Sequence, residues 1–393
     1  MSPSVPSVRH RVLNDSAIRP DGDYVLYWMI MNRRASHNFS LDRAVEICRE
    51  LDKPLLVFEA LRIGYQWASD RIHRFVLQGM AENRKRFAQT PAHYYAYVEP
   101  SADAGKGLLA ALADRACAVV TDDFPCFFIP RMLTAVAPRF SVRLEAVDSN
   151  GLFPMRATDR VFSRAHDFRR FLQKEIASHI DVVPRADPWK GSSLPNFTKL
   201  PAAISKKWPE VTDTCLQADR ASLAELDIDH SVVAAVMDGG TAQAEQRLER
   251  FVEDRLIRYG EDRSRPDVDV TSGLSPYLHF GHLSVHQVFE RLRELEGWHS
   301  DEIQGRKATG KREGWWQMSP PTESFLDEII TWREVGYNMC CHRPDFDQYA
   351  SLPEWAQKTL QEHARDKRAH LYSLEEFESA ATHDELWNAA QHQ

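Results

Sequence analysis

The chain has 393 residues, 43% of them hydrophobic, with a formal net charge of −8 and a sequence pI of about 6.1. This size suits a globular protein of more than one domain, and the acidic balance excludes a uniformly basic surface, so any DNA-binding surface must be local. The six cysteines are scattered without CxxC spacing, and neither a signal-peptide pattern nor a run of about 18 apolar residues occurs. We therefore expect a reduced, cytoplasmic, monomeric protein without a membrane span.

The first part of the chain alternates short apolar runs with segments of helical spacing. Such alternation is typical of βαβ units, and it predicts a Rossmann-like α/β domain with a parallel five-stranded sheet over residues 20–150. A GxGxxG motif is absent, so the usual dinucleotide fingerprint is missing. The five predicted strands cover residues 23–30, 53–60, 93–99, 116–123 and 141–148.

The rest of the chain differs in composition and in hydrophobic pattern. Residues 151–215 are rich in Arg, Lys and Pro and are interpreted as a linker, with one helix over 161–180 and an extended stretch over 184–201. Residues 216–393 show helical periodicity and predict an all-helical domain. Its helices are expected over 241–258, 282–296, 324–341, 352–370, 374–381 and 384–391.

The stretch TSGLSPYLHFGHLS, which begins at Thr271, places hydroxyls and a glycine before a helical pattern. Hydroxyls and unpaired backbone N–H groups at a helix start suit a phosphate, and Gly273 lets a ligand approach the backbone closely. Pro276 suits a first helical turn. On the pattern alone, a capped helix start with Ser275 as the N-cap is favoured over a phosphate site.

Glu328 and Trp332 are four residues apart in a predicted helix and so share one face. A carboxylate beside an indole could hold a flat polar ligand by hydrogen bonding and stacking. For an isolated pair, a surface glutamate beside a half-buried tryptophan is the favoured interpretation. The next two residues, Arg333 and Glu334, could form a plain ion pair.

A basic loop between two predicted helices also carries aromatic residues. Cations suit phosphates and flat rings suit bases, so this loop is a candidate for nucleic-acid contact. A solvated loop anchored by two buried tryptophans is an equally supported alternative. No spacing of histidines or cysteines indicates a metal site. The residues of this basic loop are Arg306, Lys307, Lys311, Arg312, Trp315 and Trp316.

Four segments together resemble DNA photolyases of the photolyase–cryptochrome family: YVLYWMIMNRRASHNFSLDRAVEICRELDKPLLVFEA, RYGEDRSRPDVDVTSGLSPYLHFGHLS, FLDEIITWRE and HDELWNAAQ. The details YWM…NRRASHN and THDELWNAAQ resemble the class II cyclobutane-pyrimidine-dimer photolyases. The resemblance implies an N-terminal α/β domain, a linker and a helical domain that binds FAD. It reverses the preference at the turn, which would hold the FAD diphosphate, and it adds an upstream tyrosine to the cofactor site. The turn residues are Thr271, Ser272, Gly273, Leu274 and Ser275, and the tyrosine is Tyr259.

The resemblance also implies the activity, light-driven repair of cyclobutane pyrimidine dimers in damaged double-stranded DNA by an electron from reduced FAD. Glu328 would hold the dimer, Trp332 would stack near it, and Trp387 would belong to the electron chain that reduces the flavin. An antenna chromophore in the N-terminal domain is a further possibility. The alternatives are a cryptochrome-like photoreceptor and a non-catalytic remnant. The DNA-contacting residues would be Arg306, Lys307, Lys311, Arg312, Trp316 and Arg333.

The sequence departs from the family pattern in one respect. The family continues beyond LWNAAQ with a segment that completes the flavin pocket, whereas this sequence ends at Gln393. We therefore expect an incomplete FAD-binding domain over residues 216–393, and weaker or no repair by this chain itself.

Overall fold

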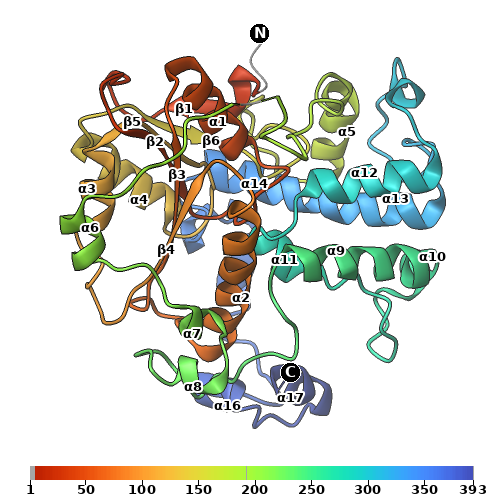
Figure 1. Cartoon of the computed structure of the whole chain (residues 1–393). Coiled ribbons are helices and arrows are strands. Elements are labelled where there is room, and N and C mark those ends of the chain that lie inside the picture. Colours follow the sequence, from red (N-terminus) through yellow and green to blue (C-terminus); the bar gives the residue numbers. More distant parts are fainter. Residues whose placement is uncertain (1–4, 192, 393) are drawn as a thin grey trace. The chain divides into compact units, whose positions relative to one another are not determined.

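The computed structural model describes residues 5–191 and 193–392 (Figure 1). The chain divides into two compact units, one ending at His342 and the other beginning at Arg343, and each is described by itself. The predicted division at residues 150 and 215 lies inside the first unit and stays a prediction.

All five predicted strands are present, and they form one parallel array in the order β6-β5-β2-β3-β4. Numbered along the chain, these five strands lie in the order 5-4-1-2-3, which is that of a doubly wound sheet. The Rossmann-like expectation therefore holds for this part of the sheet. The strands are β2 Tyr24–Met29, β3 Leu55–Leu61, β4 His93–Val98, β5 Ala116–Asp122 and β6 Leu144–Val147.

The expected all-parallel, five-stranded sheet is wrong in one respect, because a sixth strand, β1 (His10–Val12), pairs antiparallel with β6. This edge strand has only three residues, and its side chains are half-buried or exposed. Without an apolar run or a clear alternation, the segment HRV carries no strand signal of its own. Its conformation depends on the pairing of His10 with Val147.

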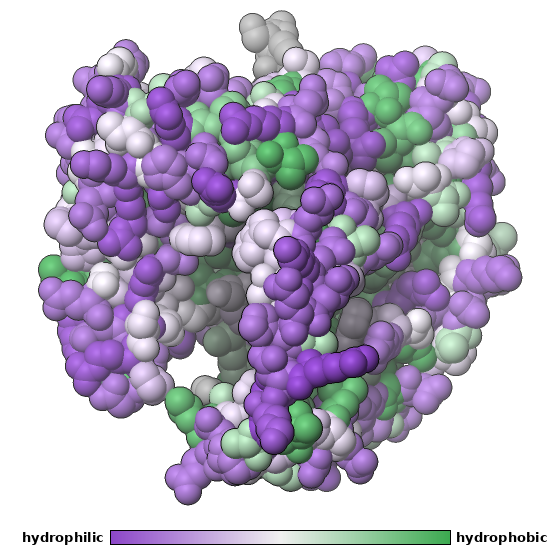
Figure 2. All heavy atoms as spheres, turned by 180° about the vertical axis from the view of Figure 1, so that it is seen from behind, coloured by the Kyte–Doolittle hydropathy of each residue, from purple (hydrophilic) through white to green (hydrophobic). Residues whose placement is uncertain are grey.

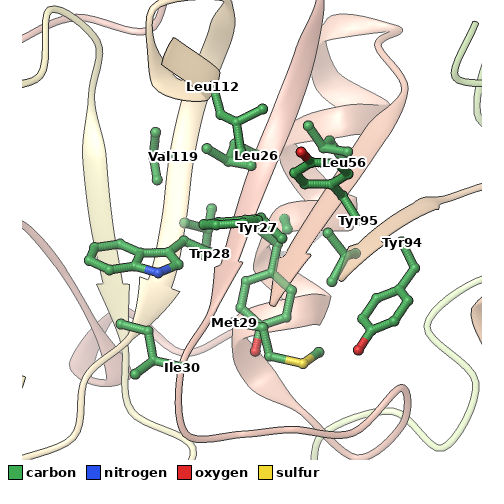
Figure 3. Close-up of a cluster of buried hydrophobic side chains, with 14 of the residues drawn as sticks. Leu26, Tyr27, Trp28, Met29, Ile30, Leu56, Tyr94, Tyr95, Leu112 and Val119 are labelled. Atoms are coloured by element: carbon green, nitrogen blue, oxygen red, sulfur yellow. The ribbon is translucent and has the colours of Figure 1, made fainter. Parts of the chain in front are cut away.

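The core of the sheet is built on β2, whose six residues are all buried. Figure 3 shows Leu26 between Leu56 of β3 and Val119 of β5, with Leu112 beside it. A strand with neighbours on both edges and helices on its faces buries every side chain, which explains the continuous apolar run YVLYWM. The helices between the strands are α1 Phe39–Leu51, α2 Asp70–Phe87, α3 Leu108–Ala113 and α4 Ile129–Val136.

After β6, the regular elements of the first unit are helices. The predicted helices over 241–258 and 324–341 are confirmed, but each contains a π-helical turn, at Phe251–Arg255 and Asp327–Trp332. Three short helices between residues 202 and 223 were not predicted. The helices are α5 Ala165–Glu175, α6 Ala202–Lys207, α7 Asp213–Leu216, α8 Arg220–Leu223, α9 Thr241–Arg250, α10 Leu256–Asp262, α11 Ser275–His279, α12 Val285–Glu296, α13 Pro320–Leu326 and α14 Arg333–His342.

The second unit contains α15 (Glu354–Glu362), α16 (Leu374–Glu378) and α17 (Glu385–His392). The helix predicted over 352–370 is therefore wrong beyond Glu362. Residues 363–370, HARDKRAH, are all exposed and offer no apolar face to bury. Without such a face, a helix of this composition gains little from tertiary packing.

The carboxyl ends of β2 and β5, where the strand order reverses, are closed by protein groups. The Asp122 carboxylate accepts hydrogen bonds from the backbone N–H groups of Ile30, Met31 and Asn32 at 2.7–2.9 Å. Beside it, the buried Arg34 guanidinium donates to the carbonyl oxygen of Gly281 at 3.0 Å. This edge of the sheet is thereby joined to the segment before α12.

Helix α14 is anchored on the chain segment that follows β6. The Glu334 carboxylate accepts hydrogen bonds from the backbone N–H groups of Leu152 (2.7 Å) and Phe153 (3.2 Å), while Arg333 donates to the Asn150 carbonyl oxygen at 2.6 Å. The expectation that Arg333 and Glu334 pair with each other is therefore wrong. Each side chain satisfies a backbone group that lies more than 180 residues away in the chain.

Burial raises the pKa of Glu334 from 4.5 to about 7. The folded state then holds a proton more tightly than the unfolded state, so this group's stabilisation is complete below about pH 4.5 and is lost as the pH rises to about 7. At 1.36 kcal/mol per pKa unit the loss is on the order of 3 kcal/mol.

We expect Glu334→Gln to remove this pH dependence. The measurement is the free energy of unfolding of both proteins in denaturant between pH 4.5 and 8, where their difference should change by a few kcal/mol. The exposed Glu302→Gln serves as the control. A difference that is constant across this pH range would contradict the prediction.

The surface opposite to the view of Figure 1 is mainly hydrophilic, with hydrophobic residues in separate patches (Figure 2). No helix in the described part of the chain is both long and apolar enough to cross a lipid bilayer.

Candidate functional site

The turn Thr271–Ser275 lies between α10 and α11. Gly273 has a φ of +64°, a left-handed conformation that L-residues rarely adopt, and Leu274 is buried in the hydrophobic core. The Ser272 hydroxyl accepts a hydrogen bond from the Leu274 N–H at 3.3 Å. Thr271 and Ser275 are exposed. Leu274 thus anchors the turn, while Thr271 and Ser275 on either side of it are exposed.

The capped-helix interpretation of this turn is wrong in its detail. Helix α11 begins at Ser275 and Leu274 occupies the N-cap position, so no side chain caps the helix. Pro276 stands in the first turn, as predicted. Because Ser275 is not used as a cap, its hydroxyl is available to a ligand. Exposed hydroxyls beside a left-handed glycine form a donor set that fits a diphosphate.

Two arginines hold the turn in place from the preceding helical segment. Arg247 of α9 donates from Nε to the Ser272 carbonyl oxygen at 3.1 Å, and Arg255 donates from Nη1 to the Thr271 carbonyl oxygen at 3.3 Å. Arg255 is also paired with Asp269 at 2.9 Å. Neither arginine was singled out from the sequence.

Glu328 and Tyr259 are brought together by a third arginine. Arg263, on the turn that ends α10, forms an ion pair with the Glu328 carboxylate and lies 5.6 Å from the centre of the Tyr259 ring. Burial raises the pKa of the Tyr259 hydroxyl, and the neighbouring Glu328 carboxylate adds to this. The phenol is therefore neutral at physiological pH. The half-buried ion pair of Arg263 and Glu328 thus lies beside the buried phenol of Tyr259.

The turn and this ion pair lie at opposite ends of one helical segment. Arg255, which holds the turn, and Arg263, which holds Glu328, are separated by eight residues, or roughly 12 Å along a helix axis. Tyr259 lies between them and packs edge-on against Phe325 of α13 at 5.2 Å. Arg255, Tyr259 and Arg263 thus connect the turn to Glu328 through the α10 segment.

Glu328 and Trp332 belong to the π-helical turn Asp327–Trp332. Such turns are uncommon and occur frequently at functional sites. Glu328 has a side chain that is 34% exposed, and Trp332 is 53% exposed. The indole is therefore free to stack on a flat ligand. Asp327, the residue before Glu328, points elsewhere and pairs with Arg169 of α5 at 2.7 Å.

The basic loop has an exposed, cationic part and a packed, aromatic part. Arg306, Lys307 and Lys311 are exposed. Trp315 is buried and Trp316 half-buried, in an aromatic cluster with Phe289 and Trp298 whose ring centres lie 5.0–6.0 Å apart. The loop is thus anchored mainly by Trp315. Three of its cations lie in solvent, whereas Arg312 is half-buried and pairs with Glu313 at 2.8 Å.

Two further predicted residues, Arg333 and Trp387, belong to different units of the chain. The half-buried Arg333 is engaged by the Asn150 carbonyl oxygen and lies over the Tyr337 ring at 4.7 Å. Trp387 belongs to α17 in the second unit, where it is 46% exposed and packs against Phe377 at 5.2 Å.

The carboxyl edge of the sheet is where an antenna chromophore would be sought by analogy with other doubly wound folds. The cavity lined there by Asn32, Arg34, Phe124 and Asn150 has a volume of about 10 Å³. That is room for about one water molecule. This place therefore does not support the antenna prediction.

Comparison with known proteins finds several with similar amino-acid sequences. A deoxyribodipyrimidine photo-lyase of Methanothermobacter thermautotrophicus is 30% identical over 384 residues, which cover 97% of this chain and 76% of the relative. The chain belongs to the photolyase–cryptochrome family. A photolyase of Arabidopsis thaliana is 27% identical over 99% of this chain and 74% of its own length. No model of a protein family matches the chain.

The structural comparison agrees with this family. A bacterial class III photolyase from Agrobacterium tumefaciens superposes with a TM-score of 0.60 at 18% identity, over 94% of this chain and 68% of that one. This likeness shows a photolyase fold. Among the family's cryptochromes, cryptochrome-2 of Arabidopsis thaliana is 43% identical over only 32% of this chain.

Within this photolyase fold, sequence reasoning missed Arg247, Arg255 and Arg263. A signal for Arg263 was present, because it stands four residues after Tyr259 on the same helical face. No pattern in the sequence linked it to Glu328, which lies 65 residues further along the chain.

Proposed function

We propose that this chain is a flavin-dependent DNA photolyase that repairs cyclobutane pyrimidine dimers. The similarity to a deoxyribodipyrimidine photo-lyase over 97% of the chain carries the proposal. The clustering of Tyr259, Arg263 and Glu328 beside the exposed Trp332 supports it. The segments YWM…NRRASHN and THDELWNAAQ favour the class II group within the family.

The residues at the turn fit the diphosphate of FAD. Exposed hydroxyls of Thr271 and Ser275 and the left-handed Gly273 would hold it, with Ser272 and Leu274 supplying the backbone of the turn and Tyr259 following along α10. Bound reduced FAD would supply, on excitation by light, the electron that splits the cyclobutane ring.

The ion pair at Glu328 suits the polar edge of a pyrimidine dimer. A carboxylate only accepts hydrogen bonds, so Glu328 would accept from a pyrimidine N3–H, while Arg263 would donate to a carbonyl oxygen. The guanidinium would also stabilise negative charge that develops on the dimer, which is an interaction stronger in the reacting state than in the ground state. Trp332 would stack on the dimer from its exposed position.

The dimer must leave the DNA helix to reach this ion pair. A damaged base step is cheaper to unstack than an intact one, and this favours extrusion of the lesion. Arg306, Lys307, Lys311 and Arg312 would contact phosphates, with affinity that falls as salt rises. Trp316 and Arg333 would support the surface from half-buried positions, and Trp387 would carry electrons toward the flavin.

The test is light-dependent repair by the purified chain. The expectation of weaker or no repair stays a prediction. The proposed function requires an absorption band of bound flavin, and a loss of thymine dimers from an irradiated oligonucleotide under blue light that exceeds the loss in a dark control. Flavin binding without repair would favour the second candidate, a photoreceptor, which the similarity to cryptochrome-2 makes the relevant alternative. A protein that does not bind FAD when it is supplied would overturn the proposal.

A further inference from the structure

The guanidinium of Arg247 lies directly against the backbone of the turn. A side chain added at Gly273 would place its Cβ 2.7 Å from the Arg247 Cζ, so the absence of a side chain is what admits the arginine. Only Nε is used for the bond to the Ser272 carbonyl oxygen, at 3.1 Å. Two Nη groups, with four N–H donors, remain at the turn.

Within the described part of the chain Arg247 has no acidic partner, in contrast to Arg255, Arg258 and Arg291. Arg255 pairs with Asp269 at 2.9 Å, Arg258 with Asp262 at 2.5 Å and Arg291 with Glu249 at 2.8 Å. Among the described residues, no carboxylate lies within 4.0 Å of the Arg247 guanidinium. A half-buried guanidinium that has free N–H donors and no acidic partner can accept an anion as its partner.

The surroundings of Arg247 favour a phosphate as this anion. Exposed hydroxyls of Thr271 and Ser275 lie on the same turn, and the hydroxyl of Tyr277 is committed to the Asp238 carbonyl oxygen at 2.7 Å. A guanidinium presents paired N–H groups that match phosphate oxygens in a bidentate arrangement.

We infer that Arg247 is a diphosphate-binding residue that neutralises charge on the dinucleotide cofactor at the turn. This inference rests on the proposed function, which places FAD there. Because the Nε bond also ties α9 to the turn, a purely structural role is the alternative. If Arg247 binds the diphosphate, its loss weakens the binding of phosphate-containing flavins only. If its role is structural, its loss weakens the binding of every flavin.

The experiment titrates the apo form of the full chain with FAD and, separately, with riboflavin, which has no phosphate. We expect Arg247→Met to weaken FAD binding roughly tenfold to a hundredfold, the range for a hydrogen bond to a charged group, and to leave riboflavin binding unchanged. Arg250→Met, on the same helix at an exposed position, is the charge-matched control and should leave both affinities unchanged.

The outcomes separate the two proposals. A wild-type chain that binds neither ligand would remove the flavin function and the inference with it. A wild-type chain that binds FAD, with Arg247→Met binding it equally tightly, would overturn the inference alone. Equal weakening of FAD and riboflavin, with a lower melting temperature of the apo protein, would assign Arg247 a structural role and also overturn it.

Discussion

Replacing Glu328 with glutamine is expected to lower light-driven dimer repair roughly tenfold to a hundredfold, because a hydrogen bond to a charged group contributes about 1.5–3 kcal/mol. The amide keeps the size of the side chain but not the charge that holds Arg263. The measurement is the initial rate of thymine-dimer loss per absorbed photon, with bound flavin quantified in each sample.

The exposed Glu253→Gln, on the π-helical turn that precedes α10, is the matched control and should repair at the wild-type rate. Arg263→Gln should lose a similar factor, and the double variant little more than either single one, because residues that act as a pair are not additive. Full repair by Glu328→Gln would refute the role assigned to this carboxylate.

Gly281→Ala is expected to lower the free energy of unfolding by more than about 3 kcal/mol, at the upper end of single-residue effects. The added Cβ would overlap the Met31 carbonyl oxygen and lie 2.7 Å from the Arg33 N–H nitrogen, both of which are backbone atoms that cannot rotate away. The φ of +73° adds a further cost for any L-residue. Relief requires the carboxyl end of β2 to move away from the segment before α12.

Gly297→Ala isolates the backbone contribution. Gly297 has a similar φ of +60°, but an added Cβ would meet nothing within 4 Å, so only the conformational cost of about 1 kcal/mol applies. Urea unfolding of the three proteins measures both values. Equal losses for the two alanine variants would show that the close approach at Gly281 is not required.

The sequence by itself determined the helices and strands whose buried residues recur at a regular spacing along the chain. The continuous apolar run of β2 predicted a central strand, and the spacing in 241–258 and 324–341 predicted the long helices. Family motifs also led to the turn at Gly273 and to Glu328. These features depend on neighbours a few residues apart, which a pattern can record.

Only the tertiary structure decided which distant groups meet. Strand β1 forms because it pairs with the edge of β6. Arg333 donates a hydrogen bond to Asn150 and does not pair with Glu334. Glu328 forms an ion pair with Arg263, which lies on a different helix. An ion pair or an edge strand gains its energy from a partner brought close by folding, and a charged side chain looks alike in the sequence whether it meets water, a backbone carbonyl or a carboxylate.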